Sequence, residues 1–136
     1  MAFSKLDLSG RTAVVVGGTS GIGRALAHGL AEAGADVVAS SRRIEQVEAT
    51  AAEIEALGRR TIRCTSDVSD RESLNELLTE CTAAFGKVDI LVNSAGITKR
   101  SPTLDLDEDD WNAILETNLT GTLRACQVFG RHMVGN

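Results

Sequence analysis

The chain has 136 residues, of which 43% are hydrophobic and 24% are charged, which is ordinary for a single globular domain spanning residues 1–136. Its net charge is −5, and no run of basic residues is longer than a pair such as Arg42-Arg43, which argues against general nucleic-acid or membrane binding. No apolar run reaches the length of a membrane span, and the first ten residues lack the order of a signal peptide, so we expect a cytoplasmic protein.

Short apolar runs alternate with helical stripes along the whole chain. A buried strand ending at Val16 is followed by a helix over 21–33, and the later helices each end near a glycine. Four strands alternating with four helices predict an α/β fold with a parallel sheet. The further strands are expected at 36–40, 60–64 and 88–92, and the further helices at 44–57, 74–85 and about 107–133.

The hydrophobic spacing also predicts which helix faces are buried. On the first helix the expected face is Ile22, Ala25, Leu26, Gly29, Leu30 and Ala33. On the last helix it is Trp111, Ile114, Leu115, Leu119, Thr122, Cys126, Phe129 and Met133. The three cysteines, Cys64, Cys81 and Cys126, follow no metal-ligand pattern, so we expect reduced core thiols and no metal site.

A glycine-rich turn separates the first strand from the first helix. Gly17 allows a tight turn, Gly21 lets backbone N–H groups approach a pyrophosphate, and Gly23 allows close packing of the helix on the sheet. The positive end of the helix dipole then faces the ligand, with Thr19, Ser20 and Ile22 in the same loop. The alternative interpretation is a glycine-rich loop that only turns the chain.

The spacing Gly17-x-x-x-Gly21-x-Gly23 resembles the short-chain dehydrogenase/reductase family, whose usual form is Thr-Gly-x-x-x-Gly-Ile-Gly. Val16 stands where the family often has Thr. The segment Asn93-Ser94-Ala95-Gly96 is similar to the family's Asn-Asn-Ala-Gly, with Ser94 replacing the second Asn. The resemblance implies a Rossmann-type doubly wound parallel sheet, truncated after the fourth βα unit, that binds a nicotinamide cofactor.

The residues that follow the second strand bear on the choice of cofactor. Sites for NAD usually carry an acidic residue there, whereas this chain has Ser41, Arg42 and Arg43. Guanidinium groups match the 2′-phosphate of NADP, so we expect NADP in preference to NAD. The alternative is that both arginines are solvated residues at the start of the second helix.

Two further segments resemble cofactor-contacting parts of the family. Asp67-Val68 matches its Asp-Val, which implies that the Asp67 carboxylate accepts from the adenine amino group; the alternative is a turn or cap residue. Asn93 is expected to tie its loop to the neighbouring strand. The small residues Ala95 and Gly96 are expected to let the backbone approach the nicotinamide ribose.

Asn118 lies among apolar residues of the last helix, where an unpaired amide would cost about 1–3 kcal/mol if buried. The segment Asn118-Leu119-Thr120-Gly121 resembles the family's Asn-Leu-x-Gly, in which the Asn holds a water of the catalytic proton relay and the helix bends. Asn118 is therefore our candidate catalytic residue. The alternative is a structural Asn that bonds a backbone carbonyl within the helix.

The resemblance implies an NADP-dependent oxidoreductase that moves hydride between the cofactor and a carbonyl or alcohol carbon of a small-molecule substrate. The loop at 97–102 resembles that of relatives that act on sugar acids, with Lys99 and Arg100 expected to meet a carboxylate. A reductase of 3-oxoacyl thioesters is the alternative, its basic loop meeting an acidic carrier. The family also uses a Ser, a Tyr and a Lys that have no counterpart here, and the sequence contains no Tyr, so we expect this chain alone to be inactive. The alternative is a non-catalytic dinucleotide-binding module. Long fourth helices pair across dimer interfaces in the family, so a second copy is an expected partner. The strand expected at 88–92 is an apolar edge, so a complementing C-terminal segment is the other expected partner.

Overall fold

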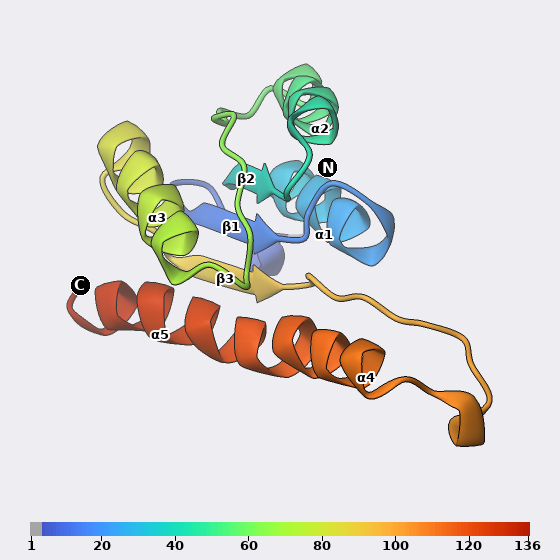
Figure 1. Ribbon diagram of the computed structural model, residues 1–136. Coiled ribbons are helices and arrows are strands. Elements are labelled where there is room, and N and C mark those ends of the chain that lie inside the picture. The colour runs from blue at the N-terminus through green and yellow to red at the C-terminus, as the bar shows by residue number, and fades with distance from the viewer. Residues whose placement is uncertain (1–3) are drawn as a thin grey trace.

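The computed structural model describes residues 4–136 and has a parallel three-stranded sheet between two layers of helices (Figure 1). The strand order is β2-β1-β3, and both pairings are parallel. The strands are β1 (Thr12–Val16), β2 (Asp36–Ser40) and β3 (Ile90–Asn93). The α-helices are α1 (Gly21–Glu32), α2 (Ile44–Ala56), α3 (Arg71–Phe85), α4 (Glu108–Leu115) and α5 (Gly121–Val134), with short 3₁₀ turns at Ser4–Leu6 and Thr103–Asp105 and a π-helical turn at Glu116–Thr120.

The central strand β1 is buried along its whole length, and its side chains alternate between two hydrophobic clusters. Ala13 and Val15 pack with Ala27 and Ala31 of α1 on one face. Val14 and Val16 pack with residues of α3 and α5 on the other, including the fully buried Phe129. Cover on both faces explains why β1 is apolar from Ala13 to Val16, and it confirms the predicted doubly wound arrangement.

The predicted strand at 60–64 is the main error in the expected sheet. The segment runs beside β2 in extended form, but the described backbone bonds between them lie only at its ends. Val37 N–H donates to the Arg60 carbonyl (3.2 Å), and Ser66 N–H donates to the Ser41 carbonyl (2.9 Å). In between, the Ser40 hydroxyl donates to the carbonyl of Cys64 (2.6 Å), so a side chain replaces a rung of the backbone ladder.

The first helix buries a different face from the predicted one. Gly23, Ala27 and Ala31 are its buried residues, whereas Ile22 is 76% exposed and Leu26 is 44% exposed. Small side chains face the sheet because α1 packs closely against β1. The larger apolar residues are displaced outward.

The last helix is interrupted by the π-helical turn at Glu116–Thr120. Such a turn accommodates more residues than an α-helical turn, so it rotates the faces before and after it relative to each other. The described buried residues of this region are Gly121, Ala125 and Phe129, while Trp111, Leu115 and Leu119 are exposed, contrary to the predicted stripe. Cys126 is also exposed, so only Cys81 is the fully buried thiol that we expected, with Cys64 half-buried.

Asp36 at the start of β2 holds the segment that follows α2. Its buried carboxylate accepts from the Arg60 N–H (3.1 Å) and from the guanidinium groups of Arg60 (2.8 Å) and Arg59 (2.9 Å). Burial alone would raise the pKa of the Asp36 carboxyl, but these hydrogen bonds and positive charges outweigh it, and the pKa lies below its ordinary value of 3.8.

We expect Asp36→Asn to lower the free energy of unfolding by about 1–3 kcal/mol at pH 7, because it removes a charged acceptor of four hydrogen bonds. A carboxyl whose pKa is lowered by folding stabilises above its unfolded pKa and loses this contribution as the pH falls through the folded pKa. The gap between wild type and variant should therefore close below about pH 4, as measured by urea unfolding. The exposed Glu80→Gln is the control, and an Asp36→Asn effect that is independent of pH would contradict the assignment.

Candidate functional site

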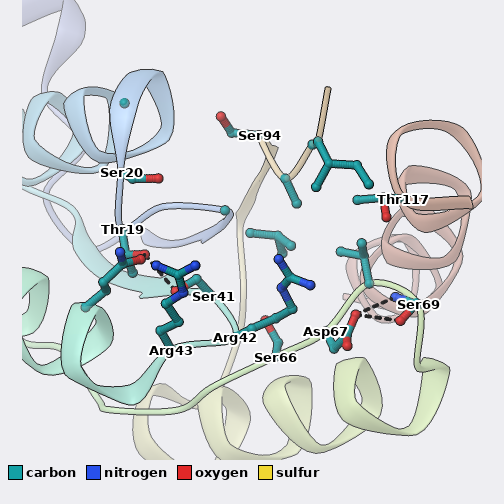
Figure 2. Close-up of a pocket in the computed structure, with 18 of the residues that line it drawn as sticks. Thr19, Ser20, Ser41, Arg42, Arg43, Ser66, Asp67, Ser69, Ser94 and Thr117 are labelled. Carbon is teal, nitrogen blue, oxygen red and sulfur yellow. Dashed lines mark hydrogen bonds between the residues drawn. The ribbon is translucent and has the colours of Figure 1, made fainter. Parts of the chain in front are cut away.

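A cavity of about 500 Å³ opens at the carboxyl ends of the strands, within the usual size of a ligand site (Figure 2). It lies between the glycine turn, the end of β2, the loop before α3 and the segment after β3. Most of the predicted cofactor residues line it: Gly17, Thr19, Ser20, Gly21, Ile22, Ser41, Arg42, Arg43, Asp67, Val68, Ala95 and Gly96. Gly23, Asn93 and Asn118 do not.

Gly17 and Gly23 form the tightest junction of the site. A Cβ on Gly17 would lie 2.4 Å from the Ala95 nitrogen, and the residue has a φ of +78° that side chains disfavour. A Cβ on Gly23 would lie 2.0 Å from the Gly17 carbonyl oxygen. The turn, the start of α1 and the segment after β3 therefore meet at a distance that only glycine permits.

The N-terminus of α1 is open toward the cavity. At Gly21 (φ +52°) nothing lies within 4 Å of an added Cβ, so the first turn of the helix is uncovered there. This first turn has no acidic residue, and the Ser20 side chain makes no capping bond. In α3 and α4, by contrast, Asp70 and Asp107 accept from the backbone of the first turn. The α1 terminus thus keeps its N–H groups and dipole available, which suits an anion such as a pyrophosphate.

The end of β2 brings the two predicted arginines to the cavity. Both are exposed, and both line it beside Ser41, as Figure 2 shows. The glycine turn is held against this corner because the N–H groups of Gly17 (2.8 Å) and Gly18 (3.2 Å) donate to the Ser40 carbonyl. Two cations and a hydroxyl therefore lie beside an uncovered helix terminus.

Asp67 faces this positive corner from the loop before α3. Its Oδ1 accepts from the Ser69 hydroxyl (2.7 Å) and from the Ser69 N–H (2.9 Å), which is the turn arrangement given above as the alternative to adenine binding. The Ser69 hydroxyl above all, with its N–H and the Arg42 charge, lowers the pKa of the Asp67 carboxyl against the effect of burial. The Asp67 side chain is thus an ionised acceptor at the cavity wall, and its turn role does not use Oδ2.

The segment after β3 supplies the wall opposite the arginines. Ala95 and Gly96 line the cavity, and the Ser94 N–H donates to the Val16 carbonyl (2.8 Å), which holds the segment beside β1. The Asn93 side chain is not the predicted tie to the neighbouring strand. Its Nδ2 donates to the Cys126 sulfur of α5 (3.3 Å) instead, because the side chain points away from the cavity toward α5.

Asn118 is in the π-helical turn and is exposed, so its expected burial among the apolar residues of the last helix is wrong. Its side chain bonds both backbone groups of Ile97: the Ile97 N–H donates to Oδ1, and Nδ2 donates to the Ile97 carbonyl, each at 2.8 Å. A Cβ on Gly96 would lie 3.3 Å from Asn118 Oδ1. Asn118 therefore holds the cavity wall from outside, which is a structural role across 21 residues of sequence.

The cavity also includes residues that were not among the predicted site residues: Val16, Gln46, Ser66, Ser69, Ser94, Ile97 and Thr117. Ser66, Ser94 and Thr117 each stand next to a predicted residue, so their position in the chain was the available signal. Gln46 comes from the first turns of α2, one helical turn after Arg42 and Arg43. Only the packing of α2 beside the glycine turn brings it to the cavity.

Outside the cavity, the basic loop after Gly96 is partly neutralised. Lys99 forms an ion pair with Asp110 of α4, and this partner raises the pKa of the Lys99 ammonium. Arg100 is exposed. Among residues 4–136, no group of three His, Cys, Asp or Glu side chains has the arrangement of a metal site. Every described helix is too short or too polar to cross a bilayer.

Comparison with known proteins agrees with this geometry. The family model "short chain dehydrogenase" matches residues 11–136. The chain is 35% identical to 2-dehydro-3-deoxy-D-gluconate 5-dehydrogenase of Escherichia coli (strain K12), covering 98% of this chain and 52% of that protein. It is 39% identical to D-threitol dehydrogenase of Mycolicibacterium smegmatis, covering 93% and 49% of the two chains.

Solved structures show the same fold. A short-chain type dehydrogenase/reductase from Mycobacterium marinum superposes with a TM-score of 0.92 at 33% identity, covering 96% of this chain and 53% of that one. The chain thus spans about half the length of the relatives it matches. Since the family model covers nearly the whole sequence and the fold agrees, this chain belongs to the short-chain dehydrogenase family.

Proposed function

We propose that this chain is the NADP-binding part of an oxidoreductase that transfers hydride between the cofactor and a CH–OH or carbonyl carbon. The observation that carries the proposal is the corner formed by Ser41, Arg42 and Arg43 beside the uncovered α1 terminus. An anionic dinucleotide needs N–H donors for its pyrophosphate and cations for a 2′-phosphate. Both kinds of donor line one cavity here.

The residues present fit this cofactor. The α1 terminus would hold the pyrophosphate, the arginines the 2′-phosphate, Asp67 the adenine amino group through Oδ2, and Ala95 with Gly96 the nicotinamide side. The cofactor supplies the hydride chemistry when it is bound. The chain's own contribution is to orient the cofactor, and Asn118 serves this by holding Ile97 and so positioning the cavity wall. The family resemblance adds the proposal that Asn118 also holds a water of the proton relay.

For the substrate we propose a polyhydroxylated or sugar-acid molecule. The names of the relatives support this class, since they act on 2-dehydro-3-deoxy-D-gluconate and on D-threitol. Arg100 is available for a carboxylate, whereas Lys99 is bound to Asp110. A 3-oxoacyl thioester is the second candidate class, through the same basic loop.

We also propose that the chain associates with a second copy through α4 and α5. Trp111, Leu115, Leu119 and Leu123 follow one another at intervals of four and are 53%, 38%, 66% and 54% exposed. Apolar side chains in such a row gain about 25 cal/mol for each Å² that they bury. Strand β3 lies at the edge of the described sheet, so pairing there with a complementing segment is a second mode of association.

NADPH should bind this chain at least about tenfold more tightly than NADH, because a charged hydrogen bond to the 2′-phosphate contributes about 1.5–3 kcal/mol. Fluorescence titration at constant salt measures both affinities. Arg42→Ala and Arg43→Ala should each reduce the ratio, while the exposed Arg131→Ala of α5 should leave it unchanged. Equal affinities in wild type would contradict NADP preference.

The 136-residue chain by itself should bind NADPH without oxidising it. The sequence has no Tyr, and the neutral amide of Asn118 does not titrate, so the usual ~10²–10⁴-fold contribution of a general acid is missing. NADPH absorbance with sugar ketones and 3-oxoacyl thioesters tests this. Turnover that copurifies with the chain and disappears in Gly21→Asp would show that another group acts as the acid.

Sedimentation should show self-association that depends on concentration. Leu119→Glu should shift the chain toward monomer, because it places a charge within the exposed apolar row. The control is Leu57→Glu, a residue 40% exposed at the end of α2, outside that row. A wild-type monomer at all concentrations would contradict the proposed association of two copies.

A further inference from the structure

The hydroxyl of Thr19 joins three parts of the site that are distant in sequence. Its Oγ1 lies 2.7 Å from Oγ of Ser41 and 3.2 Å from Oε1 of Gln46, and Thr19 is only 7% exposed. Thr19 belongs to the glycine turn, Ser41 follows β2, and Gln46 is in α2. Figure 2 shows Thr19 and Ser41 side by side at the cavity wall, next to Arg43.

Which group donates and which accepts in this chain of hydrogen bonds decides whether the Ser41 hydroxyl can donate to a ligand in the cavity. A hydroxyl has one proton and two lone pairs, and a glutamine amide donates through nitrogen or accepts through oxygen. If Gln46 accepts from Thr19, then Thr19 accepts from Ser41, and the Ser41 proton points away from the cavity. If the amide is turned over so that Gln46 donates to Thr19, then Thr19 donates to Ser41, and the Ser41 proton is free to donate to a ligand.

When an anion is bound, the surroundings favour the arrangement in which Gln46 donates to Thr19 and Thr19 donates to Ser41. Ser41 lines the cavity beside the exposed Arg42 and Arg43, and a phosphate in this corner can only accept hydrogen bonds at its ionised oxygens. The two heavy-atom arrangements of an amide are nearly the same, so turning it over disturbs little else. A ribose hydroxyl, by contrast, both donates and accepts, so either direction serves NAD.

We propose that Gln46 is a positioning residue for cofactor specificity: through Thr19 it orients the Ser41 hydroxyl to donate to the 2′-phosphate of NADP. This inference rests on the NADP preference proposed above, and it adds a residue that the glycine and arginine motifs do not contain. In this proposal Gln46 acts through its bond to Thr19 and the bond of Thr19 to Ser41, so its effect on NADPH affinity should depend on Ser41.

The test is a double-mutant cycle with Gln46→Met and Ser41→Ala, read as the affinities for NADPH and NADH. Gln46→Met should weaken the binding of NADPH about tenfold and that of NADH less than about twofold, because only NADPH loses a hydrogen bond to a charged group. In the Ser41→Ala background it should have little further effect. The control is Ala49→Met on the exposed side of α2, and Gln46→Leu replaces Gln46→Met if the latter melts early.

The outcomes separate this inference from the proposed function. If wild type binds both cofactors equally, the NADP preference fails, and the role of Gln46 fails with it. If wild type prefers NADPH but Gln46→Met lowers both affinities alike, Gln46 is structural and the inference is overturned. Additive effects of the two substitutions would overturn it as well, because Gln46 would then act without Ser41.

Discussion

The site depends on one steric constraint, the close approach of three backbone segments at Gly17 and Gly23. The Gly17 carbonyl occupies the place of a Gly23 side chain, and the Ala95 backbone occupies that of a Gly17 side chain. A Cβ at either glycine would separate α1 from the sheet or the glycine turn from β3. The cavity, the open helix terminus and the position of the arginines all follow from this junction.

Charge is distributed around the cavity in a complementary way. The α1 terminus is left without an acidic residue or a cap, while α3 and α4 each begin with an aspartate cap and acidic first-turn residues. The positive dipole end and the two arginines meet at one corner, and Asp67 lies across from them with a lowered pKa. A neutral or cationic ligand would gain little binding energy from the positive corner. An anion that also carries an amino group would complement both the positive corner and the Asp67 carboxylate.

The π-helical turn connects the cavity wall to the loop before α3. Asn118 in this turn holds Ile97, and Glu116 in the same turn pairs with Arg124. Arg124 in turn donates to the Val68 carbonyl (3.1 Å). A π turn is costly in an uninterrupted helix and is common at functional sites, and here it places two polar side chains toward different walls of one cavity.

The sequence by itself determined the glycine turn, the parallel order of βα units and the bounds of β2, because these rest on local spacing and backbone conformation. Most residues of the cavity were also predictable, since strand ends carry ligand-facing side chains in such folds. Tertiary structure alone decided three features: the segment at 60–64 is not a strand, Ile22 faces outward, and Asn118 is exposed. Their physical cause is packing: a serine side chain replaced a ladder bond, small residues took the helix face against the sheet, and a π turn rotated the last helix. Gln46 entered the site for the same reason, because only the docking of α2 beside the glycine turn places its amide next to Thr19.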